Sequence, residues 1–433
     1  MKSSLEGKRL LILNGNFISC DIVEKCRELG VYSIVTDWYE DAPAKKIADE
    51  AYNLSIADTP ALVSLARKVK ADGIYTQYTD SSLPYCLKAC EAMGFPFFVN
   101  AEQLERITNK ALSKQLCIDY GIPVSKRYYV SDALTDEDIA LIDEWPVLTK
   151  PVDNSGQRGI TICRKHDELR RGYDYAKSNS LCGKAIVEEY MHGDYMVICF
   201  TLQDGKLSLS CLADKPVISE TLAHGNIRLP KGYITPSKHL DLFYQKAFPK
   251  FQKLAEGIGL KNGSWGIECV YRNGDFYVFE MQFRLGGIKH QNFVMKEHGV
   301  DLMAMHIQYA LTGKFDMYDL SKLDDPHYKN IYATLNIVLG GGTIAEIRGI
   351  EEAGELEGVI GLVVKHQEGD VVEDIGTVFQ ILAKYSLQAH SKAELSELIR
   401  EIYSMISVKD QDGKSMLLDI WTDDDLARLK EEN

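Results

Sequence analysis

Residues 264–287 of the chain read SWGIECVYRNGDFYVFEMQFRLGG, and this stretch decides the expected fold. Two alternating apolar runs, Ile267 to Tyr271 and Phe276 to Phe279, flank the tetrapeptide at 272–275, Arg-Asn-Gly-Asp. Asn-Gly tolerates the positive φ angles of a tight two-residue hairpin turn. The pattern therefore predicts two adjacent antiparallel strands.

Four polar side chains are expected on one face of this hairpin. Glu268 and Glu280 lie at roughly mirrored positions about the turn, so both carboxylates can face the same side of the sheet as near cross-strand neighbours. Gln282 follows two residues later and shares that face because side chains alternate along a strand. Hard oxygen ligands of this kind suit magnesium, and the planar fork of Arg284 suits phosphate or carboxylate. The alternative is an ordinary solvated hairpin face.

The order Glu, hairpin, Glu-x-Gln-x-Arg-x-Gly-Gly resembles the metal-binding end of the ATP-grasp ligases, whose usual form is Glu-x-Asn-x-Arg. This resemblance implies that Glu268, Glu280 and Gln282 bind Mg²⁺ or Mn²⁺ and that Arg284 is catalytic. Gln282 departs from the usual form by one methylene group. It keeps the carbonyl ligand and lengthens its reach.

Length and charge restrict the class of protein. A chain of 433 residues with 45% hydrophobic content is expected to form about two to four globular domains. It carries 49 Lys and Arg residues against 63 Asp and Glu residues, a net charge of -14. This balance argues against a general electrostatic grip on nucleic acid or on an anionic membrane. Any bound phosphate must be held locally.

Cysteine usage and apolar runs indicate a cytoplasmic protein. The ten cysteines are scattered without a CxxC pair, which favours buried reduced thiols over zinc ligands or disulfides. The apolar run Leu10 to Leu13 is too short for a signal sequence, and nothing approaches membrane-spanning length.

The N-terminal region alternates between strand and helix patterns. Apolar runs at Lys8 to Asn14 and Val31 to Thr36 enclose a helical spacing from Ile18 to Leu29, and the alternation continues to Val99. This predicts a small doubly wound parallel-sheet domain. Because NGNFIS lacks the second and third glycines of GxGxxG, a nicotinamide site is disfavoured. The stretch 37–58 resembles the N-terminal domain of purine-pathway ATP-grasp enzymes.

A second hairpin is expected around the sequence KPVDNSGQRGI at 150–160. Its tip is long and carries glycine, so backbone amides can close on phosphate while the lysine at its base supplies a charge. A merely flexible turn is the alternative. The resemblance makes Lys150 the catalytic, nucleotide-binding lysine and makes Ser155, Gly156 and Gln157 a moving lid.

Further nucleotide contacts follow from the resemblance alone. Lys110 lies early in a helix expected over 103–120, where the family places a lysine that reaches the nucleotide; a surface lysine is the alternative for it and for Lys114. In the segment KAIVEEY the family binds adenine and ribose, which here implicates Glu188, Glu189 and Tyr190. Asp194 stands near the position of a second ribose acid. A solvated strand end is the alternative for the paired glutamates.

The rest of the chain completes the expected architecture. The irregular segment 212–239 lies in the sequence between the segment KAIVEEY and the hairpin at 264–287. It is therefore a candidate border of the site for the acceptor substrate. Helices are expected at Leu240 to Ile258 and His298 to Thr312. Beyond Asn330 a β-rich module with a helix from Lys392 to Ile406 resembles the C-terminal domain of biotin carboxylase and of L-amino acid ligases.

Together these features predict a mixed α/β and α+β chain with the ATP-grasp fold. The expected divisions are an N-terminal domain at 1–105, a nucleotide-binding part at 106–190, a catalytic part at 191–325 and a C-terminal module at 326–433.

The resemblance implies an ATP-dependent ligase with Mg²⁺ as its metal. It would activate a carboxylate as an acyl phosphate and join it to an amine, releasing ADP and phosphate. A carboxylase or carbamoyl-phosphate-synthetase-like ATPase that uses bicarbonate is one alternative, and a nucleotide-binding regulatory module is another. The expected partners are small-molecule carboxylates and amines, without nucleic acid or membrane; a homodimer is compatible with the resemblance.

Overall fold

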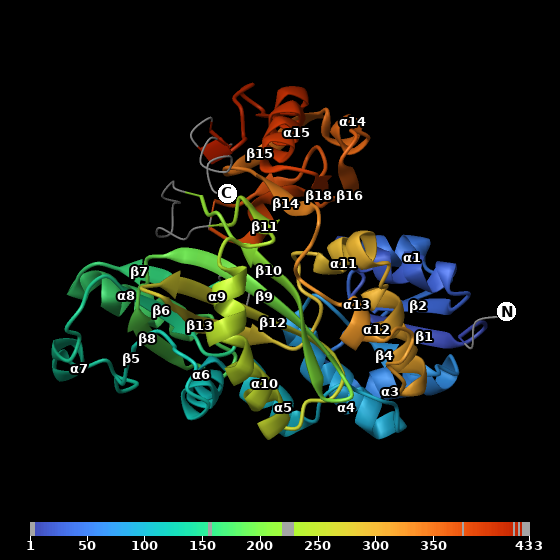
Figure 1. Cartoon of the computed structure of the whole chain (residues 1–433), viewed down its shortest axis with the longest axis horizontal. Coiled ribbons are helices and arrows are strands. Elements are labelled where there is room, and N and C mark those ends of the chain that lie inside the picture. Colours follow the sequence, from blue (N-terminus) through green and yellow to red (C-terminus); the bar gives the residue numbers. More distant parts are fainter. Residues whose placement is uncertain are drawn as a thin grey trace.

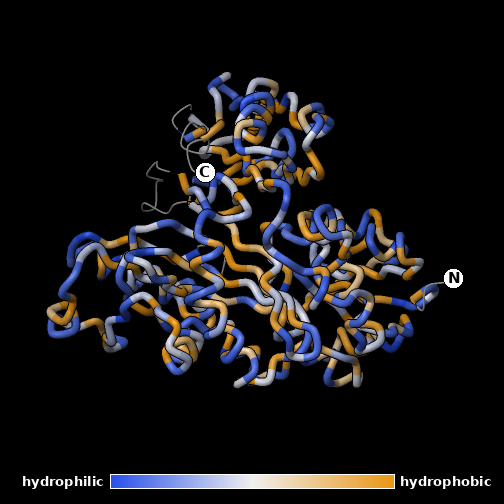
Figure 2. Tube along the Cα trace, viewed as in Figure 1, coloured by the Kyte–Doolittle hydropathy of each residue, from blue (hydrophilic) through white to orange (hydrophobic). Residues whose placement is uncertain are grey.

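The computed structural model describes residues 5–154, 158–218, 229–374, 376–418, 421–422 and 425–426. Three lobes surround a central group of long strands, and Figure 1 shows the N-terminal lobe in blue, the lobe around β5–β8 in green and the C-terminal lobe in red. Hydrophobic segments run through the central strands and through each lobe, as Figure 2 shows.

The N-terminal lobe is a parallel sheet with strand order β3-β2-β1-β4. Its strands are β1 (Arg9–Leu13), β2 (Tyr32–Asp37), β3 (Glu50–Asn53) and β4 (Gly73–Tyr75), and its helices are α1 (Cys20–Glu28), α2 (Pro43–Ile47), α3 (Thr59–Lys68) and α4 (Leu83–Met93). Residues 10–13 are wholly buried, as expected for a parallel strand covered on both faces. The predicted strand-helix-strand unit is confirmed.

The second lobe contains a small sheet with strand order β5-β8-β6-β7. It consists of β5 (Arg127–Tyr128), β6 (Val147–Pro151), β7 (Thr161–Cys163) and β8 (Ala185–Glu189), together with α7 (Asp136–Ala140) and α8 (His166–Ser178). Strands β6 and β7 pair antiparallel, so the expected hairpin around 150–160 forms. Its tip residues Ser155, Gly156 and Gln157 lie outside the described residues.

The central sheet has eight strands in the order β13-β12-β9-β10-β11-β14-β18-β16. These are β9 (Asp194–Gln203), β10 (Lys206–Asp214), β11 (Gly232–Thr235), β12 (Gly263–Arg272), β13 (Asp275–Gln282), β14 (Ile331–Val338), β16 (Val359–Val364) and β18 (Ile381–Ala389). The last three strands belong to the expected C-terminal module, so one hydrogen-bonded sheet runs from the metal hairpin into that module. The division of the chain at 105, 190 and 325 stays a prediction.

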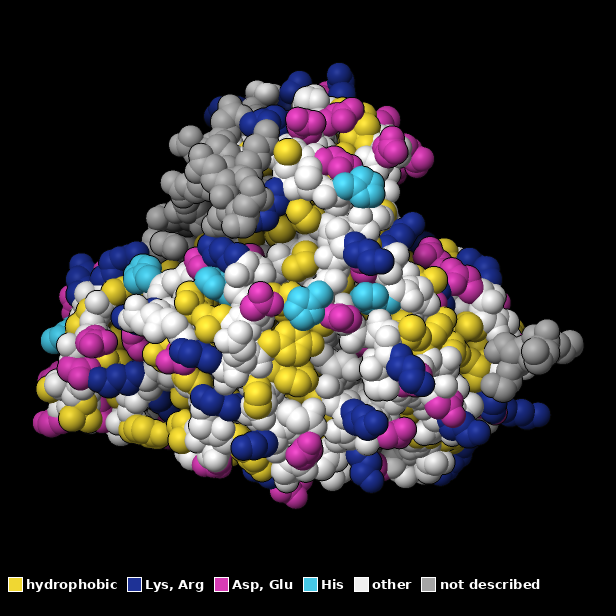
Figure 3. All heavy atoms as spheres, in the orientation of Figure 1, with side chains coloured by type: hydrophobic (Ala, Val, Ile, Leu, Met, Phe, Trp, Pro, Cys, Tyr) yellow, Lys and Arg dark blue, Asp and Glu magenta, His cyan; other side chains and the backbone are white. Residues whose placement is uncertain are grey.

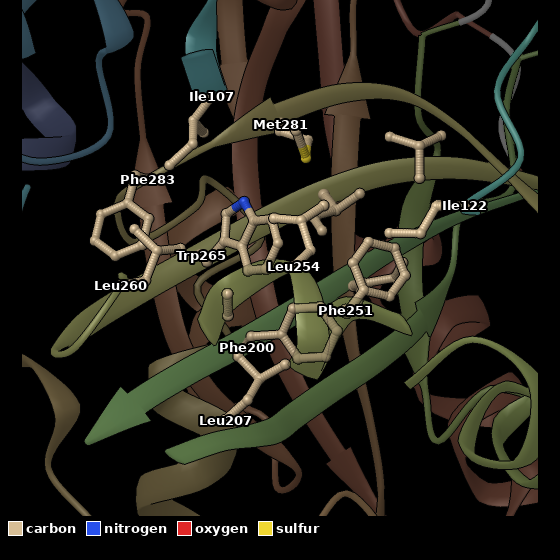
Figure 4. Close-up of a cluster of buried hydrophobic side chains, with 14 of the residues drawn as sticks. Ile107, Ile122, Phe200, Leu207, Phe251, Leu254, Leu260, Trp265, Met281 and Phe283 are labelled. Carbon is tan, nitrogen blue, oxygen red and sulfur yellow. The ribbon is translucent and has the colours of Figure 1, made fainter. Parts of the chain in front are cut away.

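A hydrophobic core fixes the hairpin end of this sheet. Trp265 on β12 and Phe200 on β9 are wholly buried against Phe251 and Leu254 of the helix α10 (Phe248–Gly257), and Figure 4 shows these side chains meeting beneath the strands. Burying one phenylalanine side chain stabilises the fold by about 1.5–3 kcal/mol, so this aromatic cluster contributes several kcal/mol. The hairpin is therefore a rigid base for polar side chains on its other face.

Two expected helices are each divided in two. The segment 103–120 forms α5 (Ala101–Thr108) and α6 (Lys110–Asp119), because the Asn109 side chain accepts hydrogen bonds from the first amides of α6 and starts a new helix. The segment 240–258 forms α9 (Leu240–Lys246) and α10, where Pro249 cannot continue the helical hydrogen bonds.

The helix expected over 298–312 forms as α12 (Leu302–Thr312) and starts four residues later than predicted, because a separate helix, α11 (His290–His298), ends before it. Gly299 closes α11 with a φ of 70°, and the Asp301 side chain caps α12.

The remaining elements form the edge of the C-terminal lobe and short connections. They are α13 (Leu320–Leu323), β15 (Gly342–Arg348), α14 (Ile350–Gly354), β17 (Val371–Val372), α15 (Lys392–Met405), β19 (Ser407–Asp410) and the single-turn helices η1 (Phe17–Ser19), η2 (Asp80–Ser82) and η3 (Val378–Gln380). The predicted helix at 392–406 is confirmed with one residue fewer.

The surface carries charges of both signs, and most of the cysteines are buried. Figure 3 shows acidic and basic side chains interspersed over the viewed face. All ten cysteines are free, and all except the half-buried Cys20 and the exposed Cys182 are buried. No helix within the described ranges is long and apolar enough to cross a bilayer.

Candidate nucleotide and metal site

The hairpin of β12 and β13 forms as its turn sequence predicts. Asn273 and Gly274 both have positive φ angles, 52° and 86°, which suit a tight turn between twisted strands. Glu268 pairs directly with Glu280, and Gly266 pairs with Gln282. The register shifts after Glu268, where an irregularity in the pairing precedes the turn. The two carboxylates are thus held as cross-strand neighbours by the backbone.

Each of these carboxylates contacts a buried lysine. Lys215 Nζ lies 2.6 Å from Glu268 Oε2, and Lys110 Nζ lies 3.3 Å from Glu280 Oε1. Burial opposes the charged form of Lys215, but Glu268 and Tyr233 hold its pKa above the ordinary value. Lysines therefore offset the repulsion between the two acids.

The donor set fits a divalent ion. Glu268, Glu280 and Gln282 line a common cavity and offer carboxylate and amide oxygens, the ligands that Mg²⁺ prefers. Because Lys215 and Lys110 contact the same carboxylates, a bound cation would compete with these ammonium groups or displace them.

Gly266 makes room for the long side chain of Gln282. A Cβ atom at position 266 would lie 2.8 Å from Gln282 Nε2 and 3.0 Å from its Cγ atom. We expect Gly266→Ala to push the Gln282 amide from its position and to raise the magnesium concentration needed for half-maximal ATP turnover several-fold, while the fold is retained because the amide end is flexible.

Steady-state ADP formation across a magnesium titration measures this effect, and Gly340→Ala is the control for substitution of a glycine, because a Cβ atom there would meet nothing closer than 3.9 Å. An unchanged magnesium dependence of Gly266→Ala would remove Gln282 from the metal site.

A buried ionic triad lies next to the hairpin. Glu188, near the end of β8, is 2.6 Å from Lys114 Nζ through Oε1 and 2.8 Å from Lys150 Nζ through Oε2. Ser125 also donates a hydrogen bond to this carboxylate over 3.2 Å. All three charged side chains are almost completely buried. The triad consequently carries one unbalanced positive charge.

The pKa values of the triad reflect this imbalance. Burial opposes the charged form of Glu188, but Lys150 and Lys114 lower its pKa to about 2. Burial lowers the pKa of Lys114 to about 8, and repulsion by Lys150 acts in the same direction. Glu188 favours the charged form but does not outweigh these two effects. One carboxylate cannot fully compensate two buried ammonium groups. A phosphate group would supply the missing negative charge.

Two adjoining cavities meet at the glutamate pair. The first, of about 200 Å³, is lined by Lys110, Lys150, Glu188, Tyr190 and Arg158, with apolar walls from Leu148, Ile162, Met191, Val270 and Phe279. The second, of about 550 Å³, is lined by Gln282, Arg284 and residues of all three lobes. Glu268 and Glu280 line both. The predicted metal ligands Glu268 and Glu280 therefore stand where the two cavities meet.

Arg284 contacts the N-terminal lobe. Its Nε and Nη2 atoms donate to the two carboxylate oxygens of Asp80 over 2.7 and 2.6 Å. Asp80 begins the single-turn helix η2, 204 residues earlier in the chain. This two-point contact fixes the plane of the guanidinium group at the edge of the larger cavity.

The chain is similar in sequence and in fold to several known enzymes. No family model matches the chain. The formate-dependent phosphoribosylglycinamide formyltransferase of Wolinella succinogenes is 25% identical over 283 residues, which are 64% of this chain and 70% of that relative. The L-amino acid ligase structure from Bacillus licheniformis superposes with a TM-score of 0.75 at 18% identity, over 94% of this chain and 99% of that one.

A third similar structure is the biotin carboxylase domain of 2-oxoglutarate carboxylase from Hydrogenobacter thermophilus, in complex with MgADP, ADP and bicarbonate. It has a TM-score of 0.72 and 22% identity, and the match covers 94% of this chain and 96% of that one. These likenesses show that the chain has the fold of the ATP-grasp proteins. The predicted fold is confirmed, and the similarity to these enzymes agrees with the predicted class of chemistry, an ADP-forming ligase that makes carbon–nitrogen bonds.

Some residues implicated by the ATP-grasp resemblance lie away from the cavities. Glu189 is ion-paired with Arg272 at 2.5 Å, and Asp194 contacts His239 at 2.7 Å and Lys238 at 3.4 Å. Neither acid is among the residues that line the two cavities described above. Their roles in nucleotide binding stay predictions.

Sequence reasoning also missed partners that the ATP-grasp fold brings to the site. Lys215 lay in an aperiodic segment, and Asp80 follows a strand of another lobe, so no local pattern marked either residue. Lys114 was assigned no role, and a surface position was the alternative for it. Its spacing of four from Lys110 places both on one helix face, and that signal could have linked them.

Proposed function

We propose that the chain binds ATP in the smaller cavity and phosphorylates a carboxylate in the larger one, after which an amine displaces the phosphate. The supporting observation is the Glu268–Glu280 pair, which stands where the two cavities meet. In this arrangement the phosphates of ATP reach toward the pair, and the second substrate approaches from the opposite side.

The lysines of the smaller cavity would hold the phosphates. Lys150 lies within the buried triad, and its ammonium group also donates to the Phe279 carbonyl over 3.3 Å. Lys110 donates to the Asn154 carbonyl at the base of the hairpin tip. Both ammonium groups are therefore positioned before the nucleotide binds, which limits the reorganisation needed in the reaction.

The apolar walls of the same cavity suit a purine ring, and Tyr190 lies beside them. The backbone after β8 is the proposed adenine contact. A cavity with an apolar wall at one side and cationic groups at its end suits a nucleotide, because the base is apolar and the phosphates are charged.

The metal would bind Glu268, Glu280 and Gln282. When bound, Mg²⁺ neutralises negative charge on the phosphates during phosphoryl transfer. Arg284 would orient the attacking carboxylate and share its charge, and Asp80 positions Arg284 for this contact. A carboxylate is already nucleophilic, so the first step needs no general base. Transfer breaks the bond between the β,γ-bridging oxygen and the γ-phosphorus and forms an acyl phosphate.

Bicarbonate is a second candidate for the carboxylate substrate, since the similar structure from Hydrogenobacter thermophilus contains bicarbonate beside MgADP. A phosphate-release screen of carboxylates, including formate and bicarbonate, with and without amines, separates the candidates. The product ADP rather than AMP is expected in every productive case. Nucleotide binding without turnover for any carboxylate would favour the regulatory alternative.

We expect Lys150→Ala to weaken ATP binding by about 1.5–3 kcal/mol, the range for a hydrogen bond to a charged group. Removal of Lys150 leaves Lys114 and Glu188 as a balanced pair, so the fold should persist. Calorimetric titration with ATP and Mg²⁺ measures the loss. Lys46→Ala, at an exposed position in the N-terminal lobe, is the control. Equal affinity of Lys150→Ala and the control would refute the proposed phosphate contact.

A further inference from the structure

The far end of the larger cavity is built from two lysines of the C-terminal lobe. Lys384 lies on β18, paired with Val363 of β16, and Lys365 directly follows β16. Both line the same cavity as Arg284 and Gln282. The cavity thus extends from the metal hairpin to a cationic wall on a different lobe.

Neither ammonium group contacts a carboxylate within the part of the chain that the structure describes. Lys384 Nζ donates to the Gly287 carbonyl over 3.0 Å, and Lys365 Nζ donates to the Val378 carbonyl over 3.4 Å. Lys384 is only 8% exposed. An ammonium group that leaves water without an anionic partner is costly.

Other buried lysines near the site do have acidic partners. Lys289 lies 2.6 Å from Asp21, Lys215 contacts Glu268 and Lys150 contacts Glu188. The two lysines of the far wall depart from this pattern. Burial, together with repulsion by neighbouring lysines, lowers the pKa of Lys365 to about 8 and lowers that of Lys384 well below its ordinary value.

A third polar group faces this region without a partner. His290 is buried and lines the cavity, and neither of its ring nitrogens has a hydrogen-bond partner among the described residues. Burial lowers the pKa of His290 to about 4, so its ring is neutral near pH 7 and can still donate one hydrogen bond. The ammonium groups of Lys365 and Lys384 and the imidazole of His290 therefore line the cavity as hydrogen-bond donors for an anionic acceptor.

We propose that Lys365 and Lys384 form an anion subsite for the non-reacting end of the substrate that occupies the larger cavity. The anion is a phosphate or a second carboxylate group, which supplies the missing negative charge. As an assignment of substrate class this rests on the proposed function. The subsite itself does not depend on it.

The test uses the full chain with ADP and Mg²⁺ present, titrated calorimetrically with inorganic phosphate, succinate or acetate. We expect one phosphate or one succinate to bind, and acetate to bind more weakly because it has a single charge. Preference for phosphate over succinate identifies a phosphorylated substrate, and the reverse preference identifies a dicarboxylate. Lys384→Met and Lys365→Met should each weaken binding at least about tenfold, the loss of one charge-assisted contact.

Lys414→Met is the matched control, because it removes an exposed lysine from the same lobe. It should bind the probe as the wild type does. Equal affinity of the wild type, Lys384→Met and Lys365→Met would overturn the proposal. Either lysine variant suffices for the comparison if the other fails to fold.

Thermal unfolding separates a ligand-binding role from a structural one. Without anion, Lys384→Met should unfold at a higher temperature than the wild type, since methionine fills a similar volume without a buried charge. The anion should then stabilise the wild type and leave the variant unaffected. A lower unfolding temperature of Lys384→Met, with stabilisation by phosphate retained, would assign the lysine a structural role.

Binding of ATP and Mg²⁺ to the same variants distinguishes the two proposals. Intact ATP binding with no lysine-dependent anion binding would reject the subsite alone. Lysine-dependent anion binding in a chain that binds no ATP would reject the proposed function alone.

Discussion

Glu280→Gln is expected to abolish ADP formation while the fold is retained. Glutamine keeps the size of the side chain but removes one of the two carboxylates that face each other across β12 and β13. A divalent ion between them would lose a charged ligand, and the phosphoryl group would lose the neutralisation that drives its transfer. A fall in turnover of at least about 10³-fold corresponds to the loss of roughly 4 kcal/mol of transition-state stabilisation.

The measurement is ADP formation against magnesium concentration once a carboxylate substrate is known. Magnesium-dependent ATP affinity should fall in parallel. Gln282→Asn is the matched comparison, because it changes only the length of a neutral ligand and should retain activity, with an altered preference between magnesium and manganese. If Glu280→Gln turns over like the wild type at limiting magnesium, the hairpin is structural and the metal lies elsewhere.

Glu188→Gln is expected to destabilise the fold by about 3–5 kcal/mol, the range for breaking a buried ion pair. The carboxylate is shared by Lys114 and Lys150, and all three groups are almost completely buried. Its replacement raises the buried charge of the triad from one positive unit to two. Chemical denaturation followed by circular dichroism measures the loss.

The double variant Glu188→Gln, Lys114→Met is the control, since it returns the triad to a single positive charge. Its stability should recover part of the loss. A Glu188→Gln protein as stable as the wild type would mean that water or rearrangement compensates the lysines. ATP should stabilise Glu188→Gln more than the wild type, because the phosphates then offset two charges.

Acid conditions test the same carboxylate. The pKa of Glu188 is depressed to about 2 in the folded chain, below its ordinary value of 4.5. Its stabilising contribution is therefore present above about pH 4.5 and is lost as the pH falls toward 2. Over this window the wild type should lose stability more steeply than Glu188→Gln.

The sequence by itself determined the hairpin of β12 and β13. Asn273-Gly274 permits only a few turn geometries, and the two-residue period of a strand then fixes which side chains share a face. The pairing of Glu268 with Glu280 needs one further feature, because a strict mirror about the turn would place Glu268 opposite Phe279. The register shift between Glu268 and Cys269 brings Glu280 there instead. The parallel N-terminal lobe followed similarly, since its alternating apolar runs have no other way to bury their strands.

Tertiary structure decided which charged side chains become neighbours in the site. Lys114 and Lys150 share Glu188 only because α6 packs beside the small sheet, and Asp80 meets Arg284 across 204 residues of chain. The lysines at 365 and 384 line the cavity because β18 continues the sheet of the hairpin through β14. Local patterns in a sequence record period and turn chemistry. Electrostatic partners depend on which surfaces meet, and packing alone sets that.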